Sequence, residues 1–126
     1  VFGICDYNPY GVALLLTYML GSKAKSFEGC QWKCSRLRWL GLHSQQIESL
    51  VLDNHAHEEL SKADIQKLEA LLCMNTLHTQ EMLPILEELQ RMYEGGRKYE
   101  LEVIYSRGIE YFSEFLERAI TVDDFL

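Results

Sequence analysis

The sequence predicts an α/β domain with a helical second half, and three observations favour this class. An apolar run over residues 1–6 is typical of a short buried strand. A tight-turn signal and an apolar helical run over residues 10–20 follow it directly, which is the order that opens a βαβ unit. Beyond residue 60, apolar residues recur at helical spacing. The 126 residues, of which 48% are hydrophobic, suffice for one domain with its own core.

The first half of the chain carries the predicted strands. Pro9 fits the first turn of the helix over residues 10–20, because an N–H at that position would have no partner within the helix. Residues 24–29 and residues 36–40 are predicted as two further strands, each of which ends near a glycine. The stretch LHSQQIESL, which follows Gly41, then predicts a short helix.

The second half begins with two predicted helices. Ser61 is a candidate N-cap for the helix that runs through KADIQKLEALLCM, and Asp64 stands where a capping box has Glu or Gln. The next apolar pattern covers residues 78–93, and Pro84 inside it indicates that the helix starts near this proline or kinks there. The run LEELQRMYE is interpreted as a solvated face of this amphipathic helix.

Two more helices are predicted on either side of Gly108. Residues 98–106 predict a short helix, and residues 109–120 predict a longer one with an apolar face. This face comprises Tyr111, Phe112, Phe115, Leu116 and Ile120. The apolar stripes on the predicted helices are interpreted as core rather than as a cofactor site.

The charge balance bears on the partners. The chain has 19 acidic and 12 basic side chains, which gives a net charge of −7. An isolated nucleic-acid-binding module is usually basic, because contacts to phosphate dominate its affinity. Charge alone therefore argues against tight DNA binding by this piece, although a metal ion at a carboxylate cluster would change the local field. No apolar stretch reaches the ~18 residues of a membrane span, so no membrane partner is expected.

Cysteine and histidine spacing gives only a weak metal signal. Cys30 and Cys34 are spaced CxxxC, and His43 follows them at a distance that a zinc site would permit. There is no second close-spaced pair, so we favour free thiols in a connecting segment over a zinc site or disulfides. His55 and His57 lie in the polar stretch DNHAHEEL, which is interpreted as a solvated loop.

Asp6 and Asn8 form the most informative motif, because they lie at the tip of the predicted first strand. Asp and Asn are common in turns and at helix N-caps, so ordinary turn chemistry is one interpretation. A metal site is the other, since ligands of open α/β sheets bind at the carboxyl ends of strands. Residues two apart share one face of a strand, and their side-chain oxygens can converge on one hard cation. Pro9 and Gly11 then turn the chain away from the site.

Three stretches, taken in order, resemble one family. They are CDYNPYGVALLLTYMLGSKAKSFE, RLRWLGLHSQQI, and LSKADIQKLEALL followed by KYELEVI. The combination resembles the C-terminal part of the topoisomerase VI A-subunit family, including its eukaryotic meiotic members that make recombination-initiating double-strand breaks. The resemblance implies a Toprim-like Rossmannoid sheet, present in part, with a helical C-terminal half. Residues 1–126 are expected to be one such domain that is truncated on its N-terminal side, because Val1 already belongs to a strand-like run.

The resemblance also implies a reaction. A tyrosine on an upstream helix-turn-helix domain attacks a DNA phosphodiester, and the Toprim domain holds Mg²⁺ with a Glu and an Asp-x-Asp pair. Asp6 and Asn8 occupy the two positions of that pair, so Asp6 is expected to be a metal ligand and Asn8 a weakened one. The tyrosine and the Glu are expected upstream of Val1. No catalytic residue is therefore assigned within this chain, and the piece alone is expected to be inactive.

The partners follow from the same resemblance. The full-length protein is expected to be a DNA topoisomerase of the ATP-hydrolysing type, to act on double-stranded DNA as a homodimer, and to require a topoisomerase VI B-like subunit. The meiotic branch implies the nucleus. Lys98 is a candidate DNA contact and Glu100 lies beside it, but a pair of surface charges is the favoured interpretation of both. Trp39 is assigned to packing.

Three functions, and a close variant of the first, remain open at this point. The first is the metal-binding part of a protein that makes meiotic double-strand breaks. The second is an inactive Toprim scaffold that binds partner subunits, which Asn8 supports because it lacks the charge of Asp. An archaeal-type A-subunit of topoisomerase VI is a close alternative to the first. An acidic α/β adaptor, suggested by net charge alone, is the least favoured.

Overall fold

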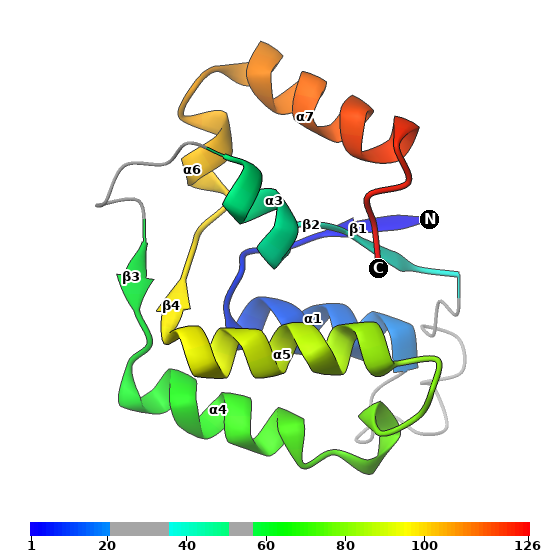
Figure 1. The fold of residues 1–126 in the computed structure, drawn as a ribbon, viewed down its shortest axis with the longest axis vertical. Helices are drawn as coiled ribbons and strands as arrows, with labels where there is room; N and C mark the ends of the chain where they lie inside the picture. Colours follow the sequence, from blue (N-terminus) through cyan, green and yellow to red (C-terminus); the bar gives the residue numbers. More distant parts are fainter. Residues whose placement is uncertain (21–35, 51–56) are drawn as a thin grey trace.

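The computed structural model describes residues 1–20, 36–50 and 57–126, and its elements begin with a strand, a helix and a second strand (Figure 1). In chain order they are β1 (Phe2–Ile4), α1 (Pro9–Leu20), β2 (Arg38–Gly41), α3 (Ser44–Ser49), β3 (Glu58–Glu59), α4 (Lys62–Leu72), the 3₁₀ helix η2 (Asn75–Leu77), α5 (Leu83–Gly95), β4 (Arg97–Lys98), α6 (Glu102–Tyr105) and α7 (Ile109–Thr121). The predicted α/β class with a helical second half is confirmed.

Strands β1 and β2 pair in parallel, as the βαβ prediction requires. Phe2 lies opposite Arg38, and Gly3 lies opposite Trp39. Backbone hydrogen bonds continue to Cys5, one residue beyond β1, where its N–H donates to the carbonyl of Gly41 at 2.8 Å. The first strand is thus shorter than predicted, but the paired backbone still leads directly to Asp6. The strand predicted over residues 24–29 and the cysteines of the CxxxC pair lie outside the described residues.

The other edge of β2 is occupied by the C-terminal residues. The N–H of Leu126 donates to the carbonyl of Trp39 at 2.9 Å, and the Trp39 N–H donates back to the Leu126 carbonyl at 3.2 Å. The ring of Phe125 packs edge-on against Phe2, with 5.0 Å between ring centroids. The chain end therefore lies beside the sheet (Figure 1).

The core lies between the sheet and three helices. Figure 1 shows α1, α4 and α5 on one side of β1 and β2, and α7 on the other side. Helices α1 and α5 contribute the largest buried apolar sets, together with α4 and β2: Val12, Leu15, Leu16, Met19, Trp39, Leu68, Leu71, Ile85, Leu86, Leu89 and Met92. Trp39 is fully buried, which confirms its assignment to packing. The predicted apolar stripes are largely core.

Residues close in the sequence determine where α4 and α5 begin. The Ser61 hydroxyl accepts the Asp64 N–H at 3.1 Å, and Asp64 accepts the Ser61 N–H at 2.8 Å, so the predicted N-cap is confirmed as a full capping box. Helix α5 begins at Leu83, so the predicted start near Pro84 is confirmed, because proline is tolerated only in the first turn of a helix. Gly96, with φ at 66°, ends α5 in the left-handed conformation that glycine adopts readily.

Two predictions fail where β3 and β4 pair. Glu58–Glu59 pairs antiparallel with Arg97–Lys98, so the stretch interpreted as a loop contains a strand. The helix predicted over residues 98–106 begins only at Glu102, because Lys98 belongs to β4. Strands of two residues have no alternation that a sequence could display, and their pairing depends on contacts between distant segments.

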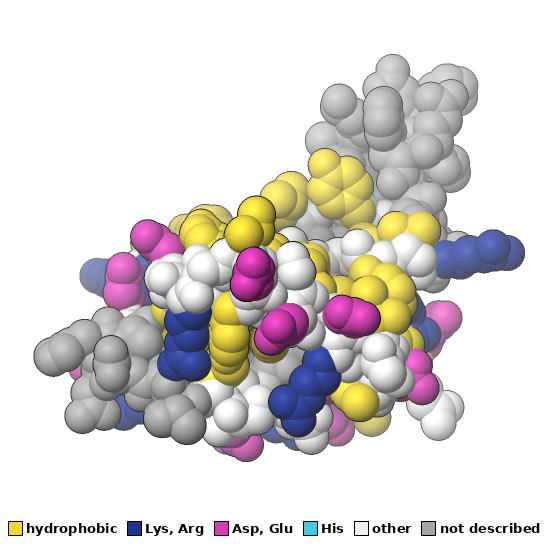
Figure 2. All heavy atoms as spheres, turned by 90° about the horizontal axis from the view of Figure 1, so that it is seen from above, with side chains coloured by type: hydrophobic (Ala, Val, Ile, Leu, Met, Phe, Trp, Pro, Cys, Tyr) yellow, Lys and Arg dark blue, Asp and Glu magenta, His cyan; other side chains and the backbone are white. Residues whose placement is uncertain are grey.

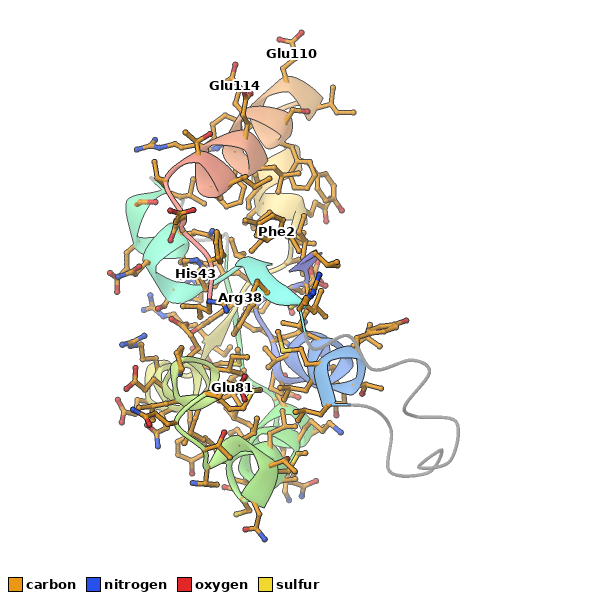
Figure 3. The ribbon with its side chains drawn as sticks, turned by 90° about the vertical axis from the view of Figure 1, so that its right-hand side faces the viewer. Phe2, Arg38, His43, Glu81, Glu110 and Glu114 are labelled. Atoms are coloured by element: carbon orange, nitrogen blue, oxygen red, sulfur yellow. The ribbon has the colours of Figure 1, made fainter. Side chains whose placement is uncertain are left out.

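Helix α7 presents a mixed face to solvent. Figure 2 looks down on the α7 side and shows acidic, basic and apolar side chains together. In Figure 3, Glu110 and Glu114 project outward from this helix. Of its predicted apolar face, four residues are half-buried, but Ile120 is 44% exposed and that assignment was wrong. Within the described part of the chain, no helix combines the length and hydropathy needed to cross a membrane.

Candidate metal centre

Asp6 lies where the paired backbone of β1 ends. Its Oδ1 accepts a hydrogen bond from the backbone N–H of Leu101 at 2.6 Å, and the residue is half-buried. Leu101 directly precedes α6, so the carboxylate joins the end of the parallel sheet to the second half of the chain. This end of a strand is where α/β sheets bind ligands, as predicted.

Asn8 serves as the N-cap of α1. Its Oδ1 accepts the N–H of Gly11 at 2.7 Å, three residues along and in the first turn of the helix. Pro9, the first helical residue, has no N–H that would need a partner. The cap interpretation is therefore confirmed, whereas a role of Asn8 in metal binding stays a prediction. Asn8 can both cap the helix and bind a metal ion only if Oδ1, which already accepts the Gly11 N–H, also contacts the ion.

Gly11 is required by close packing of the turn. A Cβ at this position would lie 2.6 Å from the carbonyl oxygen of Asp6, a distance that real Cβ atoms do not reach. It would also lie 3.3 Å from Oδ1 of Asn8. The Pro-x-Gly sequence therefore lets the chain turn sharply behind the two candidate ligands without displacing either of them.

Tyr7 anchors the motif to the core. Its backbone forms two hydrogen bonds with Tyr99, at 2.8 Å from the Tyr7 N–H and 3.0 Å from the Tyr99 N–H. The Tyr7 side chain is 5% exposed, whereas Asp6 and Asn8 on either side are half-buried. Burial raises the pKa of the Tyr7 hydroxyl, and the nearby Glu88 carboxylate adds to the increase. Asp6 and Asn8 thus flank a fixed, buried residue.

The Cys5 thiol lies next to Asp6 in the sequence. Burial raises the pKa of its thiol to about 12, and the neighbouring Asp6 carboxylate contributes to the shift. The thiol therefore stays protonated near neutral pH, and it is the thiolate that binds metals or acts as a nucleophile. Asp6 and Asn8, in contrast, carry side-chain oxygens that can bind a cation without losing a proton near neutral pH.

The donors that are present fit a hard divalent cation as part of a larger set. Asp6 supplies a carboxylate and Asn8 an amide oxygen, and Mg²⁺ prefers oxygen ligands while retaining several waters. Among residues 1–20, 36–50 and 57–126, no group of three or more His, Cys, Asp or Glu side chains is arranged to hold a metal ion.

Lys98 is engaged in an ion pair within the fold. Its Nζ lies 2.7 Å from Oδ2 of Asp64 and 3.9 Å from a carboxylate oxygen of Glu58, and its side chain is 24% exposed. Burial alone would raise the pKa of Asp64, but hydrogen bonds from Lys98 and Ser61 outweigh it and lower that pKa. The hydrogen bond to Asp64 raises the pKa of Lys98. The favoured Lys98–Glu100 surface pair is thus replaced by a link between β4 and α4, while DNA contact by Lys98 remains a prediction.

Replacing Asp64 by Asn is expected to destabilise the fold by about 1 kcal/mol at pH 7. Because the pKa of Asp64 is lowered in the folded state, its contribution is present above the ~3.9 of an unfolded Asp and is lost as pH falls through the folded value. Urea unfolding of wild type and Asp64→Asn at pH 7 and about pH 2.5 measures this. A stability difference that is unchanged at the lower pH would contradict the assignment.

The family is settled by comparison with known proteins. The family model for the Toprim domain of the topoisomerase 6 A-subunit and Spo11 matches residues 1–120. The chain belongs to this family. The resemblance predicted from the three sequence stretches is thereby confirmed.

Relatives in this family come from plants and animals. The chain is 30% identical over 126 residues to the meiotic recombination protein SPO11-2 of Oryza sativa subsp. indica, covering 100% of this chain and 31% of the relative. It is 29% identical over 113 residues to the meiotic recombination protein SPO11 of Mus musculus, covering 90% and 28%. It is 28% identical over 116 residues to the meiotic recombination protein spo-11 of Caenorhabditis elegans, and the match covers 92% of this chain and 27% of the relative. The chain spans about a third of the length of the rice relative.

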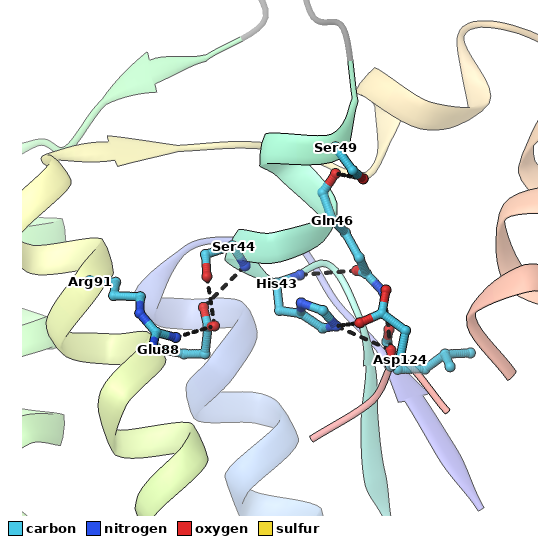
Figure 4. Close-up of polar contacts among 8 residues, drawn as sticks. His43, Ser44, Gln46, Ser49, Glu88, Arg91 and Asp124 are labelled. Atoms are coloured by element: carbon cyan, nitrogen blue, oxygen red, sulfur yellow. Dashed lines mark hydrogen bonds and ion pairs between the residues drawn. The ribbon is translucent and has the colours of Figure 1, made fainter. Parts of the chain in front are cut away.

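A second polar cluster of this family member was not predicted (Figure 4). Glu88, 1% exposed, accepts hydrogen bonds from the Ser44 N–H at 3.1 Å, the Ser44 hydroxyl at 2.7 Å and Arg91 at 2.9 Å. The interpretation of LEELQRMYE as a solvated face was therefore wrong for Glu88. A carboxylate one turn before an arginine is common on exposed helices, so the sequence held no signal of its burial.

His43 binds the C-terminal segment, whereas Cys30 and Cys34, the other residues of the weak zinc signal, lie outside the described residues. Its Nε2 lies 3.2 Å from Oδ1 of Asp124 and 3.1 Å from the Asp124 carbonyl oxygen. Gln46 donates to the carbonyls of Leu40 and Asp124, at 2.7 and 3.4 Å (Figure 4). Both buried side chains thus hold the end of the chain against β2 and α3.

Proposed function

We propose that this chain is the Toprim, metal-binding part of a type IIB topoisomerase-like protein that makes meiotic DNA double-strand breaks. The observation that carries the proposal is the Asp6 carboxylate, which lies at the carboxyl end of a parallel strand within the region matched by the Toprim family model. The relatives named as meiotic recombination proteins support the meiotic role.

The proposed reaction is a transesterification. A tyrosine hydroxyl attacks a phosphodiester of DNA, the bond from phosphorus to the 3′-oxygen breaks, and a tyrosyl–DNA ester forms. A bound Mg²⁺ would polarise the phosphate and stabilise the leaving oxygen. Asp6 would hold the ion, and Asn8 would act as a weakened second position. The tyrosine and the metal-binding Glu are assigned to the part of the full-length protein outside this chain, which covers 31% of the rice relative.

The proposed partners follow from this reaction. Double-stranded DNA is the substrate, and a homodimer can place one tyrosine on each strand. A topoisomerase VI B-like subunit would supply ATP hydrolysis, and the nucleus is the proposed location because meiotic recombination acts on chromosomal DNA. The net charge of −7 indicates that DNA contacts depend on the bound ion and on other parts of the protein.

An inactive scaffold is the second candidate, and two observations favour it. Asn8 carries no charge, and its side-chain oxygen is already engaged as the cap of α1. In addition, Tyr10, Leu14 and Tyr18, spaced four residues apart on α1, are each more than half exposed. Such exposed apolar side chains commonly mark a surface for another protein segment.

Asn8→Asp separates the two candidates. An Asp can cap α1 with one oxygen and offer the other to the ion, so the proposed metal function predicts about 10-fold or tighter Mn²⁺ binding. The matched control is Asn8→Ser, which can also cap the helix but adds no charge, and for which no gain in affinity is expected. Mn²⁺ titration of the full-length protein measures this. Equal affinity of Asn8→Asp and wild type would favour the scaffold.

A further inference from the structure

The Asp6 carboxylate is held by a segment that lies 95 residues further along the chain. The N–H of Leu101 donates to Oδ1, and two backbone hydrogen bonds join Tyr99 to Tyr7 beside it. We refer to residues 99–101 as the clamp segment. It binds both the side chain of the candidate ligand and the backbone of the residue that follows it.

The clamp segment is itself anchored in the core. Leu101 packs against the buried apolar cluster, and Ile104, in the helix that begins directly after it, is fully buried. The donor is a backbone N–H, so it has no rotamer freedom of its own. Its position relative to β1 is therefore set by packing of the second half of the chain onto the first.

We propose that the Leu101 N–H is a positioning donor for the metal site: it binds Oδ1 of Asp6 and leaves Oδ2 as the oxygen available to a cation. This inference rests on the proposed function of Asp6 as a metal ligand. Among the described residues, no hydrogen bond or ion pair engages Oδ2. A carboxylate with one oxygen fixed has fewer orientations to lose when its other oxygen binds an ion, so the donor raises metal affinity without touching the metal.

The effect has a known scale. Groups that hydrogen-bond to metal ligands orient them, and removing such a group typically weakens metal binding about 10- to 100-fold. The clamp segment therefore makes metal affinity depend on the docking of α6 as well as on Asp6. Loosening the second half of the chain would weaken the site even though no ligand had changed.

Leu101→Pro tests the donor, because proline lacks the N–H. Leu101 has φ at −56°, which proline adopts, and the preceding Glu100 lies outside any helix. The control is Leu101→Ala, which shortens the side chain but keeps the N–H. In the full-length protein, we expect Leu101→Pro to bind Mn²⁺ at least about 10-fold more weakly than Leu101→Ala, measured from the electron paramagnetic resonance signal of free Mn²⁺.

A second variant removes the N–H without introducing a proline ring, so that a clash of the ring cannot explain the result. Replacing Leu101 by its α-hydroxy acid turns the amide into an ester and deletes the N–H alone, and the same loss of affinity is expected. Unfolding midpoints without metal separate loss of the site from loss of the fold. If Asp6→Asn weakens Mn²⁺ binding but the ester binds as tightly as wild type, the positioning role is wrong and the metal site stands. If Asp6→Asn leaves binding unchanged, the proposed metal site fails and the inference fails with it.

Discussion

Replacing Asp6 with Asn is expected to weaken Mn²⁺ binding by the full-length protein at least about 100-fold, and to reduce tyrosyl–DNA complexes to a similar extent. The substitution keeps the shape of the side chain, and its amide oxygen can still accept the Leu101 N–H. It removes the negative charge of the candidate ligand at this end of β1. Loss of affinity would therefore report on the ligand and not on the fold.

Two measurements check this expectation. Mn²⁺ titration gives the affinity, and cleavage of supercoiled DNA in the presence of partner subunits gives the reaction. Glu110→Gln is the control, because it removes an equal charge from the exposed outer face of α7 (Figure 3). Wild-type affinity in Asp6→Asn would mean that Asp6 is a structural residue that holds Leu101, and the metal site would have to be sought elsewhere.

The features that could be predicted from the sequence depend on residues that are close together along the chain. Strand, turn and helix follow from the apolar runs and from Pro9 and Gly11, and these same residues place Asp6 and Asn8 at the end of β1. The Ser61 capping box was visible because its two partners lie three residues apart. Such features need no knowledge of the rest of the fold.

What could not be predicted depends on contacts between distant segments. The Leu101 N–H reaches Asp6 only when α6 is packed in place. Because the donor is a backbone group, the residue type at position 101 does not reveal it. The pairing of Leu126 with Trp39 also cannot be predicted from residue types, since any residue other than proline can supply a backbone N–H and carbonyl. The sequence thus identified one candidate ligand correctly placed on the sheet, but not the groups that orient it.

Glu88→Ala is expected to destabilise the fold by about 3 kcal/mol. The Glu88 side chain is buried and accepts both the N–H and the hydroxyl of Ser44, the first residue of α3. Its removal leaves these two donors without their partner and opens space at a buried position of α5. Hydrogen bonds to a charged group are worth about 1.5–3 kcal/mol each, so the loss should exceed that of an ordinary surface change.

The neighbouring Glu87 provides the control for this prediction. It lies on the same helix but is exposed, so Glu87→Ala should change stability by less than about 0.5 kcal/mol. Urea unfolding followed by circular dichroism compares the two variants. Glu88→Gln, which keeps an oxygen acceptor for the Ser44 hydroxyl, should fall between them. Equal stability of Glu88→Ala and Glu87→Ala would show that α3 is held by its apolar contacts alone, and that the buried carboxylate is no more than tolerated.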